Sequence, residues 1–392
     1  MPKTMMVVSL LFLGFSLSAQ TSFDKITGEI ERNSTTLAAI RKGVDADKIG
    51  SKTSIFLDNP DFEFHYLWGT PSSLDNRMDF YVTQTFDFPS VYVYKSQMAD
   101  SKIKQFDIGY QRYRISLISQ VRSILLDLVY CNAQERLFEK RMSQALALAA
   151  AYQNKLKAGE ANILEYNKAQ LNLLNLRKEA ENNGIQRDAL LNELMRNNGG
   201  VPVDFRDTVF TYTEIPADFD TWYKQYAQQV PELNLIRNEI EVSEKQEQLS
   251  FAQTLPKFSA GYMSENNSFA KLRGITAGIS IPLFENKNSV KYARAQTTAL
   301  RSMETDRNLQ VYNQLKIYHR KAIELQKAVA DYRTSLSSFD NTRFLDKALE
   351  KGEITLTDYI LELSIYYSSL SNLLETEKEM NRAVIELYQF VL

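Results

Sequence analysis

Apolar and polar residues alternate from Asp61 to Tyr66 in the stretch DFEFHYLW, residues 61–68. A period of two predicts a β-strand. One face of this strand is wholly aromatic and consists of Phe62, Phe64, Tyr66 and Trp68. The next run alternates in the same way, and one of its faces consists of Met78, Phe80, Val82, Phe86 and Phe88. Together the two runs predict a strand pair over residues 60–88.

A second strand pair is predicted over residues 256–284. The apolar positions of its first strand are even-numbered, at Phe258, Ala260 and Tyr262. Those of its second strand are odd-numbered, at Ile275, Ala277, Ile279, Ile281 and Leu283. This parity is the reverse of that in the first pair. Either a one-residue bulge or a different register of pairing would account for the reversal, and the sequence leaves both open.

A helical period follows each strand pair. Residues 90–156 contain no Pro and a single Gly, and their apolar residues recur at alternating spacings of four and three, as at Leu117, Val121, Ile124, Leu128 and Cys131. This spacing predicts a coiled-coil helix of about 100 Å. Residues 287–350 repeat the pattern without Gly or Pro and predict a second long helix. Helices of this length must pack along other helices in a bundle or tube.

A short phrase ends both long helices. It reads GEANILEY from Gly159 and GEITLTDY from Gly352. A Gly after a helix ends it in the left-handed conformation, and Asn or Thr followed three residues later by Glu or Asp forms a capping box that starts the next helix. We therefore expect tight tip turns at 157–162 and 351–355, followed by helices over 163–197 and 356–390.

The phrase belongs to a duplication of the whole chain. Residues 59–66 match residues 255–262, and similar offsets relate other parts of the two halves. The predicted organisation is a first repeat over 20–198, a linker with Gly, Pro and strand-like residues over 199–220, and a second repeat over 221–392. Each repeat has a helix, a strand pair, a very long helix, a tip turn and a further helix.

The N-terminus has the pattern of a secretory signal peptide over residues 1–19. Lys3 precedes an apolar run from Met5 to Phe15, and small residues follow up to Ala19. A membrane-spanning helix is the alternative, although it would need a longer apolar run. Gln20 follows the expected cleavage point, so no Cys is there to accept a lipid.

Little in the sequence indicates catalysis. The 392 residues carry a formal net charge of −2, which does not suggest a nucleic-acid partner. The single cysteine, Cys131, lies in a regular apolar series and is expected in the core. His65 and His319 are the two histidines, and no metal-ligand spacing, nucleophile elbow or phosphate loop accompanies them. We therefore expect no enzyme activity, no cofactor and no metal site.

The strands have the length and the two-sided character of a membrane β-barrel, although a strand of an ordinary sandwich shows the same pattern. Four strands cannot close a barrel, and an open edge in lipid would leave backbone groups unpaired. The chain must therefore oligomerise if its strands enter a membrane. Two copies would supply eight strands and three would supply twelve.

The order of elements, their duplication and the two tip phrases resemble the TolC-type outer-membrane efflux proteins. The resemblance covers essentially the whole mature chain. It implies a mainly α fold with a membrane β-barrel contribution: a homotrimer with a 12-stranded barrel in outer-membrane lipid and a helical periplasmic tunnel. It also implies a passive exit duct for efflux or type I secretion. The implied partners are a periplasmic adaptor (membrane fusion) protein and an inner-membrane pump, with an RND-type pump among the alternatives.

The resemblance also assigns site residues. The acids that follow the tip turns match those that narrow the periplasmic entrance in the family: Glu165, Asp358 and the neighbouring Glu362. Capping alone would also account for the first two. The residues expected to form the tips and to dock the adaptor are Gly159, Glu160, Asn162, Gly352, Glu353 and Thr355. The aromatic face of residues 62–68 is expected to meet lipid.

One rival remains open from the sequence. A soluble periplasmic coiled-coil scaffold, with its strands in a small covered sheet, would show much of the same pattern. The cargo of a duct, whether metal ion, drug or protein, also stays open.

Overall fold

The computed structural model describes residues 22–71 and 74–391. The expected signal peptide lies outside the described residues. The chain is mostly helical and divides into two compact units. The sheet unit comprises Ile40–Arg112 and Ala227–Gln310, and the hairpin unit comprises Tyr113–Tyr226 and Val311–Leu392 together with the chain up to Ala39.

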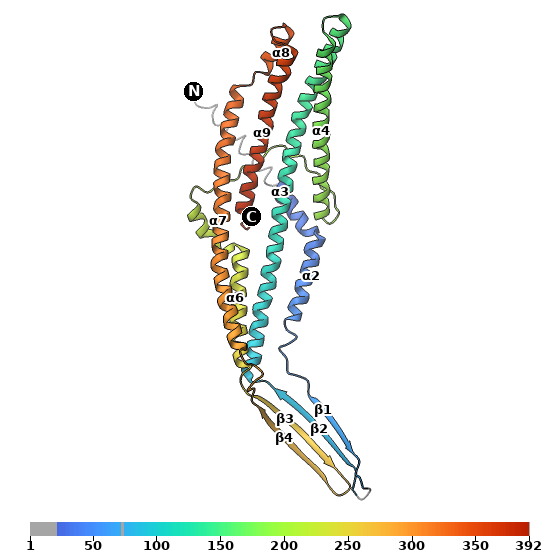
Figure 1. Ribbon diagram of the computed structural model, residues 1–392, viewed down its shortest axis with the longest axis vertical. Helices are drawn as coiled ribbons and strands as arrows, with labels where there is room; N and C mark the ends of the chain where they lie inside the picture. Colours follow the sequence, from blue (N-terminus) through green and yellow to red (C-terminus); the bar gives the residue numbers. More distant parts are fainter. Residues whose placement is uncertain (1–21, 72–73, 392) are drawn as a thin grey trace. The chain divides into compact units, whose positions relative to one another are not determined.

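The sheet unit is built on four antiparallel strands in the order β1-β2-β3-β4 (Figure 1). They are β1 (Asp61–Leu67), β2 (Arg77–Phe86), β3 (Lys257–Asn266) and β4 (Lys271–Ser280). The two strand pairs predicted from the sequence therefore lie next to each other in one sheet.

The register of the strands explains the reversed parity. In the first pair an even-numbered residue faces an even-numbered one, as Phe64 faces Phe80. In the second pair even faces odd, as Phe258 faces Ile279. The ladder of β3 and β4 continues without a bulge, so the different register is the correct alternative. Since directly opposed residues share a face, this register keeps the apolar positions of all four strands on one side.

The sheet unit also contains helices. They are most of α2 (Thr35–Gly50), all of α6 (Pro231–Ala252) and the first parts of α3 (Pro89–Ala158) and α7 (Ser289–Ser338). Val91 on α3 packs with Leu249 and Ala252 on α6, and Phe88 covers them. This small core fixes the point at which the chain leaves β2 for the long helix α3.

Two helical hairpins form the hairpin unit. The first hairpin is α3 with α4 (Ile163–Asn197), and the second is α7 and α8 (Thr342–Glu350) with α9 (Leu356–Tyr388). Each has an apolar seam of its own, such as Ala145 and Ala149 against Leu173 and Leu176. Cys131 is buried, as its apolar series predicts.

Shorter elements complete this unit. A helix over 22–33 packs Ile26 and Ile30 against α3. Helix α5 (Phe219–Tyr226), followed by the 3-10 turn Ala227–Gln229, places Phe219 and Trp222 in an aromatic cluster with Leu315 and Leu387. No strand is assigned between residues 199 and 218, so the strand-like residues of the linker do not form one. An extended segment becomes a strand only where a second strand pairs with it.

The prediction of one uninterrupted helix over 287–350 is wrong. The helix ends at Ser338, and α8 begins at Thr342. The carboxylate of Asp340 accepts hydrogen bonds from the backbone N–H of Thr342 at 3.2 Å and from its hydroxyl at 2.8 Å. Ser, Asp and Asn side chains compete in this way with the helical backbone bonds. The cluster SSFDN, which contains neither Gly nor Pro, is therefore enough to break the helix.

Candidate functional site

One face of the sheet is apolar and exposed. Along β1 and β2 the paired residues on this face are Phe62 with Val82, Phe64 with Phe80, and Tyr66 with Met78. Along β3 and β4 they are Phe258 with Ile279, Ala260 with Ala277, and Tyr262 with Ile275. Phe64 is 64% exposed and Ile275 is 89% exposed. The predicted aromatic residues thus belong to a larger apolar face that crosses all four strands, and Trp68, just beyond β1, is 77% exposed.

The opposite face of the sheet is mostly polar or small. It carries Glu63 and His65 on β1, and Asp79, whose side chain is buried between strands. The guanidinium of Arg77 binds Asp79 and Glu265, each at 2.7 Å, and so ties β2 to β3. A sheet with one apolar and one charged face separates two environments of different polarity.

The first tip turn has the geometry that its sequence predicts. Gly159 has a φ of +75°, and the N–H of Glu160 donates to the carbonyl of Lys155 at 2.8 Å, which closes the end of α3. The side chain of Asn162 accepts from the N–H of Glu165 at 2.9 Å. The carboxylate of Glu165 accepts from the N–H of Asn162, also at 2.9 Å. The capping box is therefore confirmed.

The second tip turn repeats this arrangement. Gly352 also has a φ of +75°, and the N–H of Glu353 donates to the carbonyl of Ala348 at 2.8 Å. Thr355 caps α9: its hydroxyl accepts from the N–H of Asp358 at 3.2 Å and donates to the Asp358 carboxylate at 2.6 Å. The Thr355 hydroxyl is the main reason that the pKa of Asp358 lies below its ordinary value, and the Thr355 N–H and the Lys168 ammonium act in the same direction.

The two tips contact each other. The ammonium of Lys168, on α4, donates to the hydroxyl of Thr357, on α9, at 2.6 Å. Tyr152 and Ala169 of the first hairpin pack against Leu356 of the second. Both tip turns lie at the same end of the hairpin unit (Figure 1), and the contacts between them are made by neighbouring residues that the sequence analysis did not name. Asp358 and Glu362 are exposed and Glu165 is half-buried, so all three carboxylates are reachable from solvent.

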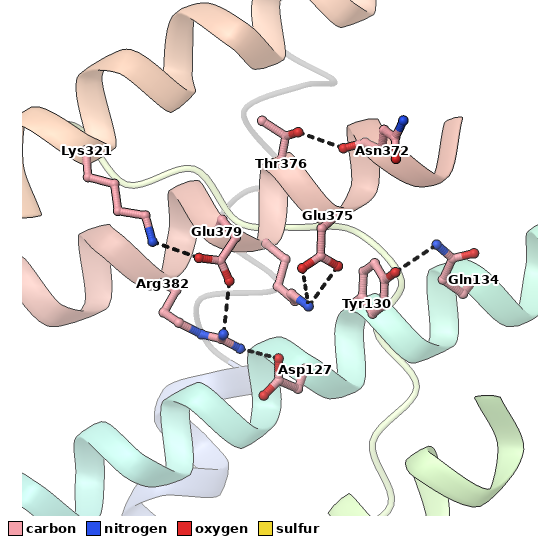
Figure 2. Close-up of polar contacts among 10 residues, drawn as sticks. Asp127, Tyr130, Gln134, Lys321, Asn372, Glu375, Thr376, Glu379 and Arg382 are labelled. Carbon is pink, nitrogen blue, oxygen red and sulfur yellow. Dashed lines mark hydrogen bonds and ion pairs between the residues drawn. The ribbon is translucent and has the colours of Figure 1, made fainter. Parts of the chain in front are cut away.

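A charged network joins the two hairpins (Figure 2). The sequence analysis did not predict it. Asp127 on α3 binds Arg382 on α9, and Arg382 also binds Glu379 at 3.0 Å. Glu379 in turn accepts from the ammonium of Lys321, on α7, at 2.7 Å. The signal that could have revealed it is Asp127 itself, a single charge inside the apolar run ILLDLVY.

The two carboxylates of this network differ in their pKa shifts. Burial raises the pKa of Asp127 above its ordinary value, although Arg382 and Lys378 oppose the shift. The pKa of Glu379 is lowered, first by the hydrogen bond from Lys321 and then by the nearby positive charges. Burial therefore outweighs pairing at Asp127, whereas pairing outweighs burial at Glu379.

A second set of contacts extends the network toward the tips. Lys378 binds Glu375 at 2.8 Å, and its ammonium lies 4.3 Å from the centre of the Tyr130 ring. The amide of Gln134 donates to the Tyr130 hydroxyl at 3.2 Å (Figure 2). Burial, followed by the charge of Glu375, raises the pKa of Tyr130.

The histidines lie apart from any metal-binding arrangement. His319 is buried against Phe219, and its Nε2 lies 2.6 Å from the carbonyl oxygen of Pro216. His65 is exposed on the sheet, 3.6 Å from Glu63. Within residues 22–71 and 74–391, no group of three His, Cys, Asp or Glu side chains could hold a metal ion. No helix in this part of the chain is long and apolar enough to cross a membrane.

Comparison with solved structures identifies the fold. The Campylobacter jejuni CmeC outer membrane channel superposes with a TM-score of 0.77 at 14% identity, over 94% of this chain and 85% of that one. The transmembrane-channel protein CusC gives 0.78 at 13% identity, over 94% and 91%. The outer membrane protein VceC from Vibrio cholerae gives 0.75 at 12% identity, over 95% and 96%. No protein-family model matches the chain, and no curated protein sequence matches it.

The chain therefore has the fold of outer-membrane channel proteins. The resemblance to TolC-type proteins predicted from the sequence is confirmed at the level of the fold. The similar structures belong to channel proteins rather than enzymes.

Proposed function

We propose that this chain is an outer-membrane exit duct of an efflux or type I secretion system. The observation that carries the proposal is the sheet: one exposed apolar face crosses four strands, in a chain with the fold of outer-membrane channels. An exposed apolar patch of this size is unusual on a soluble monomer and marks a contact with lipid or protein. Lipid suits the aromatic residues, which are favoured at membrane interfaces.

The edges of the sheet favour an oligomer. Strands β1 and β4 each pair with a single neighbour, so one edge of each has unpaired backbone groups. Unpaired groups cost several kcal/mol each in hydrocarbon, and closing the sheet with other copies removes the cost. Three copies would form a 12-stranded barrel, which agrees with the trimers implied by the resemblance to TolC-type proteins. The polar face with Glu63 and Asp79 would then line the passage.

The tip turns are proposed as the periplasmic entrance and the adaptor-docking surface. Three copies would bring six turns around one opening, with Glu165, Asp358 and Glu362 near it. Exposed groups available to an adaptor protein include Gly159, Glu160, Asn162, Gly352, Glu353 and Thr355. The duct itself is passive, and an inner-membrane pump would supply the energy.

Fractionation of cells that express the full chain tests the proposal. The mature protein should be absent from the soluble periplasm and should be extracted from the outer membrane by detergent as a trimer. Recovery of a folded, soluble protein from the periplasm would instead support the coiled-coil scaffold and would contradict the duct.

A further inference from the structure

The boundary between the two helical hairpins is polar, whereas each hairpin is held together by apolar side chains. Helices α3 and α9 run antiparallel along this boundary. Their contacts include Gln144 with Tyr367, where the two side-chain oxygens lie 2.5 Å apart, and Gln134 with Ser371, at 3.4 Å. Of the apolar clusters in the described residues, only the one at the tips contains side chains from both hairpins. Apolar packing alone therefore specifies the position of one hairpin along the other only weakly.

The charged network lies along this boundary at a distance from the tips, beyond the contact of Gln134 with Ser371. Charges alternate along it from Asp127 to Arg382, Glu379 and Lys321, so that α9 is bound to α3 on one side and to α7 on the other (Figure 2). Farther from the tips, the boundary opens into a cavity of about 470 Å³ lined by residues of both helices, among them Ile118 and Val384. The network is therefore the last set of direct contacts between α3 and α9 before this cavity.

A shift of α9 by one heptad, seven residues, would conserve the helical faces in contact. In one direction Glu375 would take the place of Arg382, and two carboxylates would oppose each other at Asp127. In the other direction Asp127 would meet the last turn of α9, near Tyr388, which has no basic side chain and contains Glu386. Either shift therefore leaves Asp127 without its guanidinium partner. Charges placed in this way act against the wrong arrangement as well as for the right one.

A shift of this kind would separate the tips. Seven helical residues span about 10 Å, so one tip turn would project beyond the other by that distance, and Lys168 would lose Thr357. We propose that the ion network of Asp127, Arg382, Glu379 and Lys321 is a register key that sets the two tip turns level with each other. Asp127 and Arg382 cross the boundary and are the positioning residues for the tips, while Glu379 and Lys321 anchor Arg382 within the second hairpin.

Three of the four charges of this key, Arg382, Glu379 and Lys321, lie in the second half of the chain, and Asp127 lies in the first. At the offset of 193 that relates the two tip phrases, Arg382 corresponds to Ala189 and Glu379 to Gln186. The charges are therefore not a general feature of the repeated unit. An adaptor would then meet a ring of six tips at one level. This consequence rests on the proposed function, whereas the register of the two hairpins does not depend on that function.

The test measures which residues of the two tips lie opposite each other. In a Cys131→Ala background, the full mature chain carries one cysteine pair at a time and is treated in detergent with a short bismaleimide. Lys168→Cys with Thr357→Cys reports the observed register. Lys168→Cys with Ser364→Cys reports a shift by one heptad in one direction, and Asn175→Cys with Thr357→Cys reports the other. Mass spectrometry of the monomer band identifies the cross-links within one chain.

The charge reversal Arg382→Glu should remove most of the cross-link of the first pair and produce one for a shifted pair. Adding Asp127→Arg should restore the first. The matched control is Arg333→Glu, which breaks the 2.6 Å ion pair with Glu377 between α7 and α9, inside the second hairpin. The control should leave the first cross-link unchanged, because the tip turn already fixes the register within that hairpin.

Three results would overturn the register key: a first cross-link that survives Arg382→Glu, an equal loss with Arg333→Glu, or no recovery in the double variant. If the Arg382→Glu chain is not recovered folded, the double variant Asp127→Asn with Arg382→Gln can be used instead. Its neutral pair no longer favours one register, so the native and the shifted cross-links should both form. A native cross-link alone in that variant contradicts the key. The experiment uses neither membrane nor partner, so its failure leaves the duct proposal standing, and a soluble chain with native cross-links would refute the duct alone.

Discussion

Asp358 forms hydrogen bonds with the backbone N–H and the hydroxyl of Thr355, and these bonds suffice for its role as a cap. Asp358→Ala should weaken the start of α9 by about 1 kcal/mol. If the carboxylate also lines the entrance, removing three such charges from a trimer should change the single-channel conductance or the ion selectivity in a planar bilayer. Glu165→Ala provides the parallel measurement at the first tip. Unchanged conductance and selectivity in both variants would leave only the capping role.

Glu379 makes a pH-dependent contribution to the stability of the hairpin unit. Its pKa lies below the ordinary glutamate value, mainly because of the hydrogen bond from Lys321. The stabilisation is therefore fully present above the ordinary glutamate pKa and is lost as the pH falls through the lowered value. Glu379→Gln should destabilise the chain at pH 7, by about 1 kcal/mol given the solvent screening of such pairs. Melting in detergent at a series of pH values should show the difference from the unmodified chain vanish under acidic conditions.

The control for this measurement is Glu139→Gln, which changes an exposed acid on α3. It should have little effect on the melting temperature at any of these pH values. A deficit for Glu379→Gln that stays constant down to acidic pH would show that the ion pair with Lys321 is not its cause.

At the scale of residues, the sequence predicts those side chains whose partners are local. Asn162 and Glu165 are three positions apart, so their capping box can be read from the sequence alone. Asp127 and Arg382 are 255 positions apart, and nothing local to either one indicates its partner. The tip turns could therefore be predicted, whereas the partner of Asp127 could not.

The tip turns depend on glycine at a single backbone position each. Gly352 has a φ of +75°, and a Cβ added there would meet no atom within 4 Å, so the cost of a side chain is confined to the backbone. Gly352→Val should strain the turn by about 1–3 kcal/mol. The trimer should still form, because the long bundle can absorb this local cost, while pump-dependent export falls.

Gly184, inside α4, is the matched control. It also has no atom within 4 Å of an added Cβ, and its backbone is helical. Gly184→Ala should leave both trimer yield and export unchanged, or stabilise the chain slightly. Equal losses of export in the two variants would show that the left-handed turn has no special part in docking.

The strands offer a test of which face meets lipid. Phe64 lies on the apolar face opposite Phe80, and Glu63 lies on the other face opposite Tyr81. Phe64→Arg should impair assembly in the outer membrane, because a cation on the lipid face of a barrel costs about 2–4 kcal/mol near the membrane centre. Glu63→Arg should be tolerated. Equal trimer yields for the two variants would contradict the assignment of the faces.

At the scale of elements, hydrophobic periodicity predicts the strands, the long first helix and the helices after each tip. It misses the interruption between α7 and α8, because the cause is a set of side-chain bonds from Asp340 rather than a Gly or a Pro. It also leaves the register of β3 and β4 open, since the pairing is fixed only when both strands are in place.

At the scale of the whole molecule, the order of the elements and the repeat predicted from the sequence indicate the fold that the comparison with solved structures supports. The number of copies is a different matter. An open sheet with edges β1 and β4 requires other chains if it enters lipid. The strand pairs that would close the barrel lie between chains, so a single chain does not define how many copies take part. The trimer therefore stays a proposal supported by the open edges of the sheet and by the resemblance to TolC-type proteins.

The most direct test of the duct is the conductance of the purified protein in a planar lipid bilayer. The mature chain, extracted from membranes by detergent and added to one side, should insert as a trimer and give discrete, long-lived conductance steps. The polar face of its sheet would provide the passage, and its apolar face would meet the lipid. A folded chain that gives no conductance steps under conditions where a known outer-membrane channel inserts would contradict the account.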